Sequence, residues 1–501
     1  MPLVKTTESA AGRPRSVPGL SLSTYSILVA TGAFATTFAQ QRVLAKYPTT
    51  FLLKDHLHLG KEQVAVFFFW ATFAWNIKPL AGILTDAFPL FGTRRRSYMA
   101  LGSIGAALCW LTMALFPSDY RMLLGTCVAM NVATVLASTV MGGLMVEAGH
   151  TFGVSGRISA LRQVVQSIAG ICAPLIGGYF AGSLLGWTKT TVVGAASVAA
   201  LAVITLIYLR EPRTARSEPL QAFAPRQSVS PVVWIGIIAA SATVLHLLRL
   251  GEEMRTIAIS LFALLAVFIL IVLLTIVPTR NAVLAKSQDQ LSQILRSGTL
   301  WMASAMLLLI YTVPGLETAL TFRQADVLHF TPAFIGRLSA IEGIAGVVGA
   351  ALYMTLCRRA PLRWLIVLSV GFHAALTLLY LVYTRATAIP VHTALGFIVV
   401  LSELALMDLA VRSTPKGCEA LGFALMMSVR NFGQSLSDVL GSKLIDTYKM
   451  PFSKLVYVNA GTTAAVLLFV FFLPRAIVGL REGGSRAMPA APTPGEERAA
   501  V

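Results

Sequence analysis

The chain has 501 residues, of which 56% are hydrophobic and only 12% are charged, and its net charge at pH 7 is +18. Soluble domains carry about 25% charged residues, so these charges are too few to cover a water-facing surface. The composition therefore indicates an integral membrane protein. It argues against a nucleic-acid partner, because lysine and arginine in such proteins gather in cytoplasmic loops instead.

Apolar runs of about 20 residues, each long enough to cross about 30 Å of hydrocarbon as a helix, recur along the chain. A short N-terminal segment (1–21) precedes six expected helices, at 22–53, 62–88, 97–116, 120–147, 157–184 and 188–210. A central linker (211–297) carries a helical pair at 231–248 and 256–278, between polar stretches. Six more helices are expected, at 298–328, 333–357, 362–384, 388–411, 418–444 and 454–478.

This pattern predicts an all-α integral membrane protein with about fourteen spans and a disordered tail at 481–501. The six-helix units occupy 22–210 and 298–480, and an even number of inserted helices keeps both units in the same orientation. With both termini cytoplasmic, the cytoplasmic loops hold about twice as many lysines and arginines as the outer loops. We therefore expect a multi-pass protein of the cell inner membrane.

An internal repeat relates the two units. Residues 53–59 (LKDHLHL) and 324–330 (QADVLHF) follow the first helix of each unit, and a shift of 271 positions places Asp55 on Asp326 and His58 on His329. Parallel halves of this kind build the major facilitator fold, in which substrate binds between the halves near mid-membrane. The predicted fold is therefore two six-helix halves with an extra two-helix insertion.

Four stretches narrow the family. They are FLLKDHLHL (51–59), KPLAGILTDAFPLFGTRRRSYMALGS (78–103), FRQADVLHFTPAFIGRL (322–338) and STPKGCEALGFALMMSVRNFGQSLSDVLG (413–441). Together they resemble the folate-biopterin transporter family of the major facilitator superfamily. The resemblance implies proton-linked or exchange transport of pterins or folates, with no enzymatic activity and no cofactor.

One departure from the family pattern affects the fourth helix. The family usually carries acidic residues there, in a D-x-x-x-D-A-L-x-V-E stretch, whereas this chain reads STVMGGLMVE over 138–147. Ser138 and Gly142 stand where the acids would be, and only Glu147 remains. The chain therefore resembles a divergent member of this family, and the sequence does not identify its substrate.

Charged residues inside the helices are candidate binding groups, because an ionisable side chain in hydrocarbon is costly. If the first helix is continuous, Arg42 and Lys46 share one face and suit an anionic substrate. If it ends near Gln40, both lie in an outer loop. The candidate substrate-binding residues are Gln41, Arg42, Lys46, Lys78, Arg162, Gln163, Arg430 and Asn431.

The alternatives for the later cations are structural ion pairs. Lys78 precedes Pro79, which removes a backbone donor and favours a kink that aims Lys78 at a partner. Arg162 and Gln163 have counterparts in Arg430 and Asn431, on the corresponding helix of the second half. Either set can line the central cavity or hold neighbouring helices together.

Among the acids, Glu342 lies mid-helix, is the deepest and has the least charge around it in sequence, so it is the first candidate for the proton-coupling residue, followed by Glu147. Asp408 and Arg412 are four residues apart and favour a local salt bridge. At the cytoplasmic surface, Gly82, Asp86, Arg94, Arg95 and Arg96 are expected to form a gate, in which Asp86 pairs with an arginine or caps a helix.

The sequence shows no metal-ligand spacing, no nucleotide-binding loop and no catalytic motif. The function predicted is secondary transport of an organic anion such as folate or a pterin, coupled to protons, by a monomer in the lipid bilayer. The alternatives are an exporter of another amphipathic compound and a membrane assembly or binding protein that has kept the fold without transport.

Overall fold

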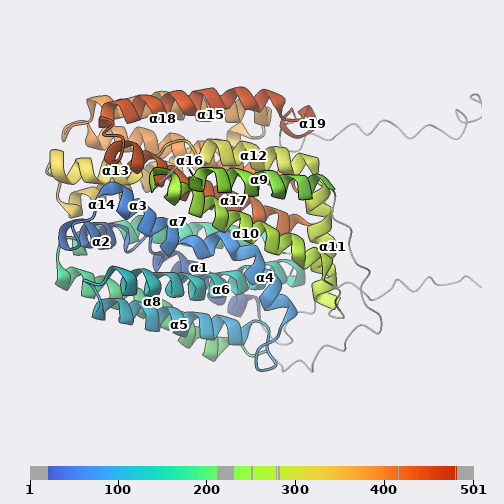
Figure 1. The fold of residues 1–501 in the computed structure, drawn as a ribbon. Coiled ribbons are helices and arrows are strands. Elements are labelled where there is room, and N and C mark those ends of the chain that lie inside the picture. The colour runs from blue at the N-terminus through green and yellow to red at the C-terminus, as the bar shows by residue number, and fades with distance from the viewer. Residues whose placement is uncertain are drawn as a thin grey trace, which may run out of the picture.

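The computed structural model describes residues 21–481 except 153, 212–230, 250–251, 278, 280–281, 416 and 480. Most of the predicted N-terminal segment, part of the linker and nearly all of the tail lie outside the described residues. Within the described part every regular element is a helix, and most of these helices run side by side (Figure 1).

The N-terminal half contains long helices interrupted at two places. Its elements are α1 (Leu22–Phe38), α2 (Lys46–Phe51), a π-helical turn η1 (Leu52–His56), α3 (Lys61–Ala71), a 3₁₀ turn η2 (Phe73–Ile77), α4 (Lys78–Ala87), α5 (Arg96–Leu115), α6 (Tyr120–Phe152), α7 (Ser155–Phe180) and α8 (Leu184–Tyr208). The prediction of one continuous helix over 22–53 is wrong, because residues 39–45 form turns between α1 and α2.

The C-terminal half repeats this plan. Its elements are α12 (Gly298–Tyr311), α13 (Glu317–Phe322), a π-helical turn η3 (Arg323–Val327), α14 (Pro332–Leu356), α15 (Leu362–Thr377) with a 3₁₀ turn η4 (Leu378–Val382), α16 (Ala388–Ser413), α17 (Glu419–Asp446), α18 (Phe452–Val466) with a 3₁₀ turn η5 (Leu467–Phe472), and the short α19 (Arg475–Val478). The helix expected over 298–328 is therefore broken as well.

The linker contains the inserted pair α9 (Pro231–Arg249) and α10 (Glu252–Ile276), followed by α11 (Ala282–Arg296). The polar stretch expected to end this linker is a helix instead, because its apolar residues recur on one face that packs on α4, α10 and α17. Its axis is bent by 73° from that of α12. It lies across the end of the bundle in Figure 1.

Nine helices in the described part are long and apolar enough to cross a membrane, or ten if the bent pair of α11 and α12 counts as one span. Shorter apolar helices include Leu22–Phe38, Val233–His246 and Leu265–Ile276. The chain is therefore a multi-pass membrane protein, but the predicted number of fourteen spans is not confirmed.

The breaks before α2 and α13 occur at equivalent positions of the internal repeat that the sequence suggested. Both α2 and η1 correspond, residue for residue at a shift of 271, to α13 and η3. His58 and His329 also have nearly the same left-handed backbone, with φ of +53° and +52°. A bilayer offers no water to unpaired backbone groups, so the breaks need partners. At the second break, Gly315 N–H donates to the Ser437 carbonyl at 2.8 Å.

Glycines let one helix in each half approach its break. A Cβ on Gly177 of α7 would lie 2.1 Å from the Leu44 carbonyl oxygen, and a Cβ on Gly441 of α17 would lie 1.8 Å from the Gly315 carbonyl oxygen. Leu44 and Gly315 are themselves 271 positions apart. The same packing therefore supports both breaks.

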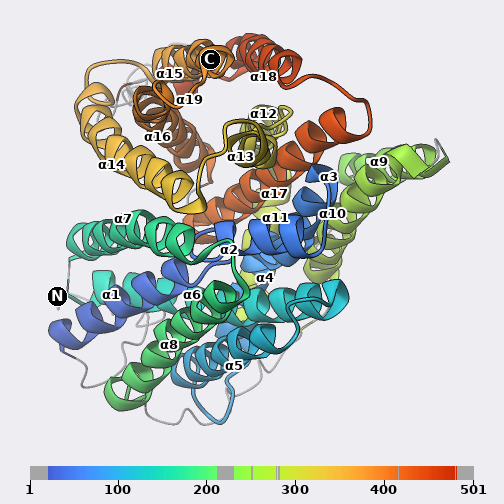
Figure 2. The ribbon, with the colours of Figure 1, turned by 90° about the vertical axis from the view of Figure 1, so that its left-hand side faces the viewer.

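Each half has its own apolar core. The largest cluster gathers residues of α12, α14–α17 and the chain after α18, and two others lie among α1–α8. The halves meet where α7 packs on α14 and where α3 and η2 pack on α17. Figure 2 shows this division, with α9 and α10 on one flank.

The direction of the helices defines two ends of the bundle. We call the end that holds the start of α1 and the end of η5 the terminal end. The opposite end is the distal end, and it carries the connections 57–60, 116–119, 181–183, 328–331, 383–387 and 447–451. α2, η1, α13 and η3 all lie in the distal half of the bundle.

The glycine contacts make a testable prediction. Gly177→Ala and Gly441→Ala should each lower the melting temperature of the purified protein, because overpacking costs about 1–3 kcal/mol. Gly170→Ala in α7 and Gly461→Ala in α18 are matched controls, since nothing lies within 4 Å of a Cβ at either position. Equal melting temperatures for all four variants would contradict this packing.

Candidate functional site

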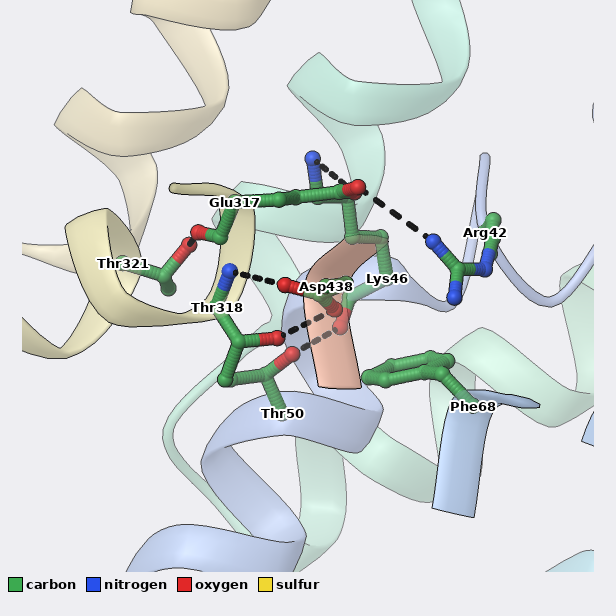
Figure 3. A pocket seen from close by; sticks show the side chains of 8 residues that line it. All are labelled: Arg42, Lys46, Thr50, Phe68, Glu317, Thr318, Thr321 and Asp438. Atoms are coloured by element: carbon green, nitrogen blue, oxygen red, sulfur yellow. Dashed lines mark hydrogen bonds and ion pairs between the residues drawn. The ribbon is translucent and has the colours of Figure 1, made fainter. Parts of the chain in front are cut away.

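A cluster of charged side chains joins the two halves where the broken helices face each other (Figure 3). Glu317, at the start of α13, lies 2.9 Å from Lys46 Nζ through Oε1 and 3.3 Å from Arg42 Nη1 through Oε2. Its side chain is 32% exposed. One carboxylate of the C-terminal half therefore bridges two cations of the N-terminal half.

Asp438 of α17 completes the cluster. It accepts hydrogen bonds from the Thr318 backbone N–H at 2.9 Å and from the Thr318 hydroxyl at 2.7 Å. The cavity among these groups is also lined by Thr50, Phe68 and Thr321, and its volume is about 10 Å³. That is room for about one water molecule, so the cluster is closed in this conformation.

The break in the first helix explains how two cations reach this position. Neither sequence alternative for Arg42 and Lys46 is right as stated, because the helix stops at Phe38 and yet both side chains remain inside the bundle. Arg42 lies in the turns between α1 and α2, with its guanidinium 5.5 Å from the Phe68 ring centre. Its Nε and Nη2 atoms are buried and have no hydrogen-bond partner within the described part.

The repeat makes the central pair symmetric in position and opposite in charge. Lys46 and Glu317 are 271 positions apart, the same shift that relates the π-helical turns. Each is the first residue of its six-residue helix. The approximate two-fold relation between the halves therefore brings the two side chains together.

Further ion pairs join the halves toward the distal end. Lys54 lies 2.6 Å from Asp326, Lys61 lies 3.2 Å from Asp446, and Lys443 lies 3.2 Å from Glu62. Burial by itself lowers the pKa of Lys54, but hydrogen bonds to Asp326 and Asp55 outweigh it and hold that pKa above its ordinary value.

The ion pairs between the halves are not evenly distributed along the bundle. Within the described part of the chain, every ion pair between the halves lies in the distal half of the bundle. The pairs Asp86–Arg95, Glu342–His392, Asp408–Arg412 and Glu403–Arg430 each stay within one half.

The other predicted binding residues lie apart from this cluster. Gln41 is fully buried and donates to the Thr49 hydroxyl at 2.6 Å. Lys78 Nζ is 3.0 Å from Ser138 Oγ and 5.2 Å from the Trp75 ring centre. Arg162 and Gln163 are on α7, where Gln163 is exposed.

Arg430 has a carboxylate partner, as the alternative interpretation expected. It pairs with Glu403 of α16 and lies 5.3 Å from the Tyr311 ring centre. Its Nη1 also donates to Asn431 Oδ1 at 3.3 Å. These contacts hold α12, α16 and α17 together within the C-terminal half.

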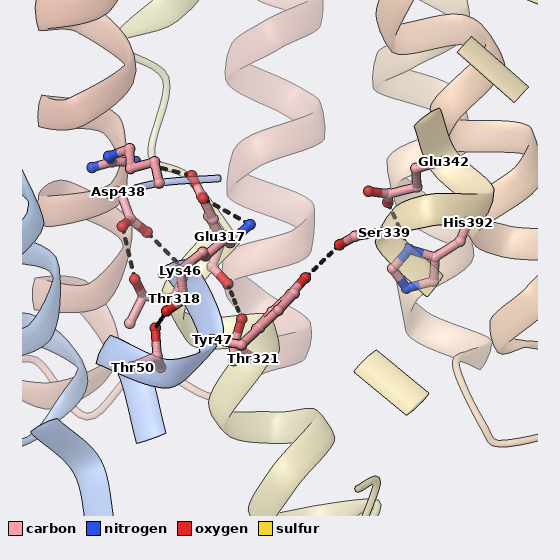
Figure 4. A network of polar contacts seen from close by, with 11 residues as sticks. Lys46, Tyr47, Thr50, Glu317, Thr318, Thr321, Ser339, Glu342, His392 and Asp438 are labelled. Atoms are coloured by element: carbon pink, nitrogen blue, oxygen red, sulfur yellow. Dashed lines mark hydrogen bonds and ion pairs between the residues drawn. The ribbon is translucent and has the colours of Figure 1, made fainter. Parts of the chain in front are cut away.

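The two predicted proton-coupling acids have different surroundings (Figure 4 shows Glu342). Glu342 Oε1 lies 2.6 Å from His392 Nδ1, and the opposite ring nitrogen lies 2.7 Å from the Tyr383 hydroxyl. His392 is 5% exposed and Glu342 is 35% exposed. Glu147 is buried and accepts a hydrogen bond from the Tyr25 hydroxyl at 3.0 Å.

The predicted gate residues form a compact surface motif at the terminal end. Asp86 pairs with Arg95 at 2.7 Å, as one of the two sequence alternatives proposed. The backbone N–H groups of Arg94, Arg95 and Arg96 donate to the Glu211 carboxylate at 2.9–3.0 Å. Glu211, rather than Asp86, therefore caps the start of α5. A Cβ on Gly82 would lie 3.7 Å from Thr139 of α6.

Several residues of these networks were not among the predicted site residues. They are Glu317, Asp438, His392, Glu403 and Glu211. The shift of 271 that aligns Asp55 with Asp326 also aligns Lys46 with Glu317, so the internal repeat could have identified this pair from the sequence. No local pattern marks the others, because their partners are distant in sequence. In the part of the chain that the structure describes, no group of three metal-binding side chains is present.

Exchange of the central charges provides a direct test. Lys46→Glu and Glu317→Lys should each impair distal closure and lower stability by about 1.5–3 kcal/mol, the usual worth of a hydrogen bond to a charged group. The double variant should recover most of that loss in melting temperature and in transport. The control is the exchange Asp408→Arg/Arg412→Asp, within one half. A double variant as impaired as the worse single variant would contradict the direct pairing.

Comparisons with known proteins agree with this geometry. The sequence profile of the BT1 family matches residues 40–483. The folate-biopterin transporter of Synechocystis is 24% identical over 455 residues, covering 88% of this chain and 79% of that protein. Folate transporter 1 of Plasmodium falciparum is 22% identical over 458 residues, covering 86% of this chain and 76% of that protein.

Two solved structures share the fold. A POT family transporter, PepTSo, superposes with a TM-score of 0.66 at 12% identity, covering 91% of this chain and 98% of its own. A D-xylose-proton symporter superposes with a TM-score of 0.59 at 10% identity and the same coverages. The predicted major facilitator fold is confirmed. The chain belongs to the BT1 family of folate-biopterin transporters, and it is a multi-pass membrane transporter of a small molecule and not an enzyme.

Proposed function

We propose that this protein is a proton-coupled secondary carrier that moves an organic anion, such as folate or another pterin, by alternating access. It acts as a monomer in the cell inner membrane with both termini cytoplasmic. The names of its relatives support the substrate class. The excess of lysine and arginine in the loops of the terminal end supports the orientation.

The bridge made by Glu317 carries the proposal. Its carboxylate holds Arg42 and Lys46 across the boundary between the halves. A carboxylate of the substrate has the same charge and the same hydrogen-bond acceptors, so it can take the place of Glu317 beside these two cations. Buried, unpartnered donor atoms on Arg42 supply the additional hydrogen bonds that such an exchange requires.

The proton-binding role is assigned to Glu342, with His392 as its partner. A group that carries a proton needs a carboxylate or an imidazole that can hold the proton inside the membrane. Glu342 and His392 are in direct contact at 2.6 Å and the Glu342 side chain is partly exposed, which supports this role. Ser339, one turn before Glu342 on α14, is hydrogen-bonded to Tyr47, which is next to Lys46. These contacts form a short path between the proton site and the ionic cluster.

With this orientation, the described conformation is closed toward the outside. The substrate then has access from the cytoplasm, and opening of the distal ion pairs gives the opposite state. A substrate carboxylate that displaces Glu317 would weaken the contact between the halves. Binding and opening are therefore coupled by competition for the same cations.

Uptake into proteoliposomes tests the function. Labelled folate and a labelled reduced pterin should accumulate when a pH gradient is imposed, and accumulation should stop when a protonophore dissipates the gradient. Empty liposomes are the control. No gradient-dependent accumulation of either compound would contradict the proposal.

A substitution of Glu342 tests its proposed role in proton coupling. Glu342→Gln keeps the size of the side chain and removes its charge, so it should abolish gradient-driven accumulation while leaving exchange of labelled for unlabelled substrate largely intact. Normal gradient-driven accumulation by Glu342→Gln would exclude Glu342 as the coupling residue, and Glu147→Gln would then be examined in the same way.

A further inference from the structure

The cations inside the bundle differ in whether a carboxylate neutralises them. Glu317 lies beside both Arg42 and Lys46, and Glu403 lies beside Arg430. Lys78, by contrast, has no carboxylate within 4 Å in the described part of the chain. Its Nζ contacts the Ser138 hydroxyl at 3.0 Å and lies 5.2 Å from the centre of the Trp75 ring.

Arg162 adds a second positive charge to this region. It is on α7, which packs on α6, the helix that carries Ser138. Its Nε atom is buried and has no hydrogen-bond partner among the described residues. Two cations without a carboxylate are unfavourable inside a membrane protein. An anion that binds between them would neutralise this charge and so lower the free energy of the site.

The neighbouring face of α6 leaves room for such an anion. Ser138 and Gly142 are one helical turn apart and lie on the same side of α6. A Cβ added at Gly142 would meet nothing within 4 Å. The position that faces Lys78 therefore holds a small hydroxyl side chain with open space beside it. The indole N–H of Trp75 donates to the side-chain oxygen of Asn131 at 2.9 Å, which holds the Trp75 ring in place beside Lys78.

We propose that Lys78, Ser138 and Arg162 form a subsite for a carboxylate of the transported molecule, separate from the cluster around Glu317. This assignment rests on the proposed function and makes it more specific. The part of the substrate that binds here is a carboxylate, and the hydrogen-bond donors of a pterin ring bind elsewhere. The Ser138 hydroxyl donates to the carboxylate, Lys78 and Arg162 supply the charge, and Trp75 flanks the bound group.

The critical experiment changes the charge at position 138. In Ser138→Asp the new carboxylate lies beside Lys78 and neutralises it, whereas Ser138→Asn adds a side chain of the same size without charge. The probes are p-aminobenzoylglutamate, which has carboxylates and no pterin, and biopterin, which has a pterin and no carboxylate. Binding of each to the purified full-length protein is measured by titration calorimetry, and the melting temperature of each variant confirms folding.

We expect Ser138→Asp and Lys78→Met to weaken binding of p-aminobenzoylglutamate by about ten-fold or more, as loss of a charge-assisted hydrogen bond does. Ser138→Asn, whose amide can still donate a hydrogen bond, should weaken this binding less than Ser138→Asp does, and biopterin should bind all variants equally. Equal binding of p-aminobenzoylglutamate by Ser138→Asp and the wild type would overturn the subsite. So would a loss confined to biopterin, or no binding of p-aminobenzoylglutamate by the wild type. Folate uptake in the same preparation shows whether the proposed function also fails.

Discussion

The bridge from Glu317 to Arg42 and Lys46 is the constraint on which the rest of this structure depends. Three charged groups lie between the halves of a membrane protein, where each would be costly alone. Arg42 lies in the break after α1 and Lys46 begins the helix after it, and the carboxylate begins the helix after the equivalent break in the second half. The ionic contact between the halves therefore lies at the two equivalent breaks in their helices.

The halves contact each other differently at the two ends, through ion pairs toward the distal end and through apolar packing of α4 on α17 toward the terminal end. The inter-half ion pairs of the described residues gather toward the distal end, and glycines at the α7–α14 contact allow close approach there. A Cβ on Gly336, for example, would lie 2.4 Å from the Pro174 carbonyl oxygen. At the terminal end, Asp86 and Arg95 pair within one half instead. Small changes at the ionic cluster can therefore decide which end is open, because packed interfaces switch between discrete arrangements.

The sequence predicted the membrane class, the two repeated halves, the inserted pair and the family. Composition and a residue-for-residue repeat determine these features. It failed where local patterns are ambiguous: most of residues 39–45 (AQQRVLA) are good helix formers, and 282–296 are polar enough to suggest a loop. Both segments contact helices that are distant in the sequence, and local sequence patterns do not reveal such contacts.

The candidate site was predicted in part for the same reason. Arg42 and Lys46 stand out as charges in an apolar run, whereas Glu317 follows the sequence Val-Pro-Gly-Leu and looks like a residue at a helix end. Its role depends on a partner 271 positions away. His392, Glu403 and Asp438 likewise acquire partners only when helices far apart in the chain come together.

If Glu317 holds the distal end closed, its loss should separate the halves there, and a distance measurement can detect this change. Spin labels at Ser118 and Ala386, exposed positions on distal connections of opposite halves, report the separation by pulsed electron resonance after the five native cysteines are replaced. We expect a single distance in the otherwise wild-type protein and a new, longer population in Glu317→Gln. The same distance distribution in both proteins would contradict it.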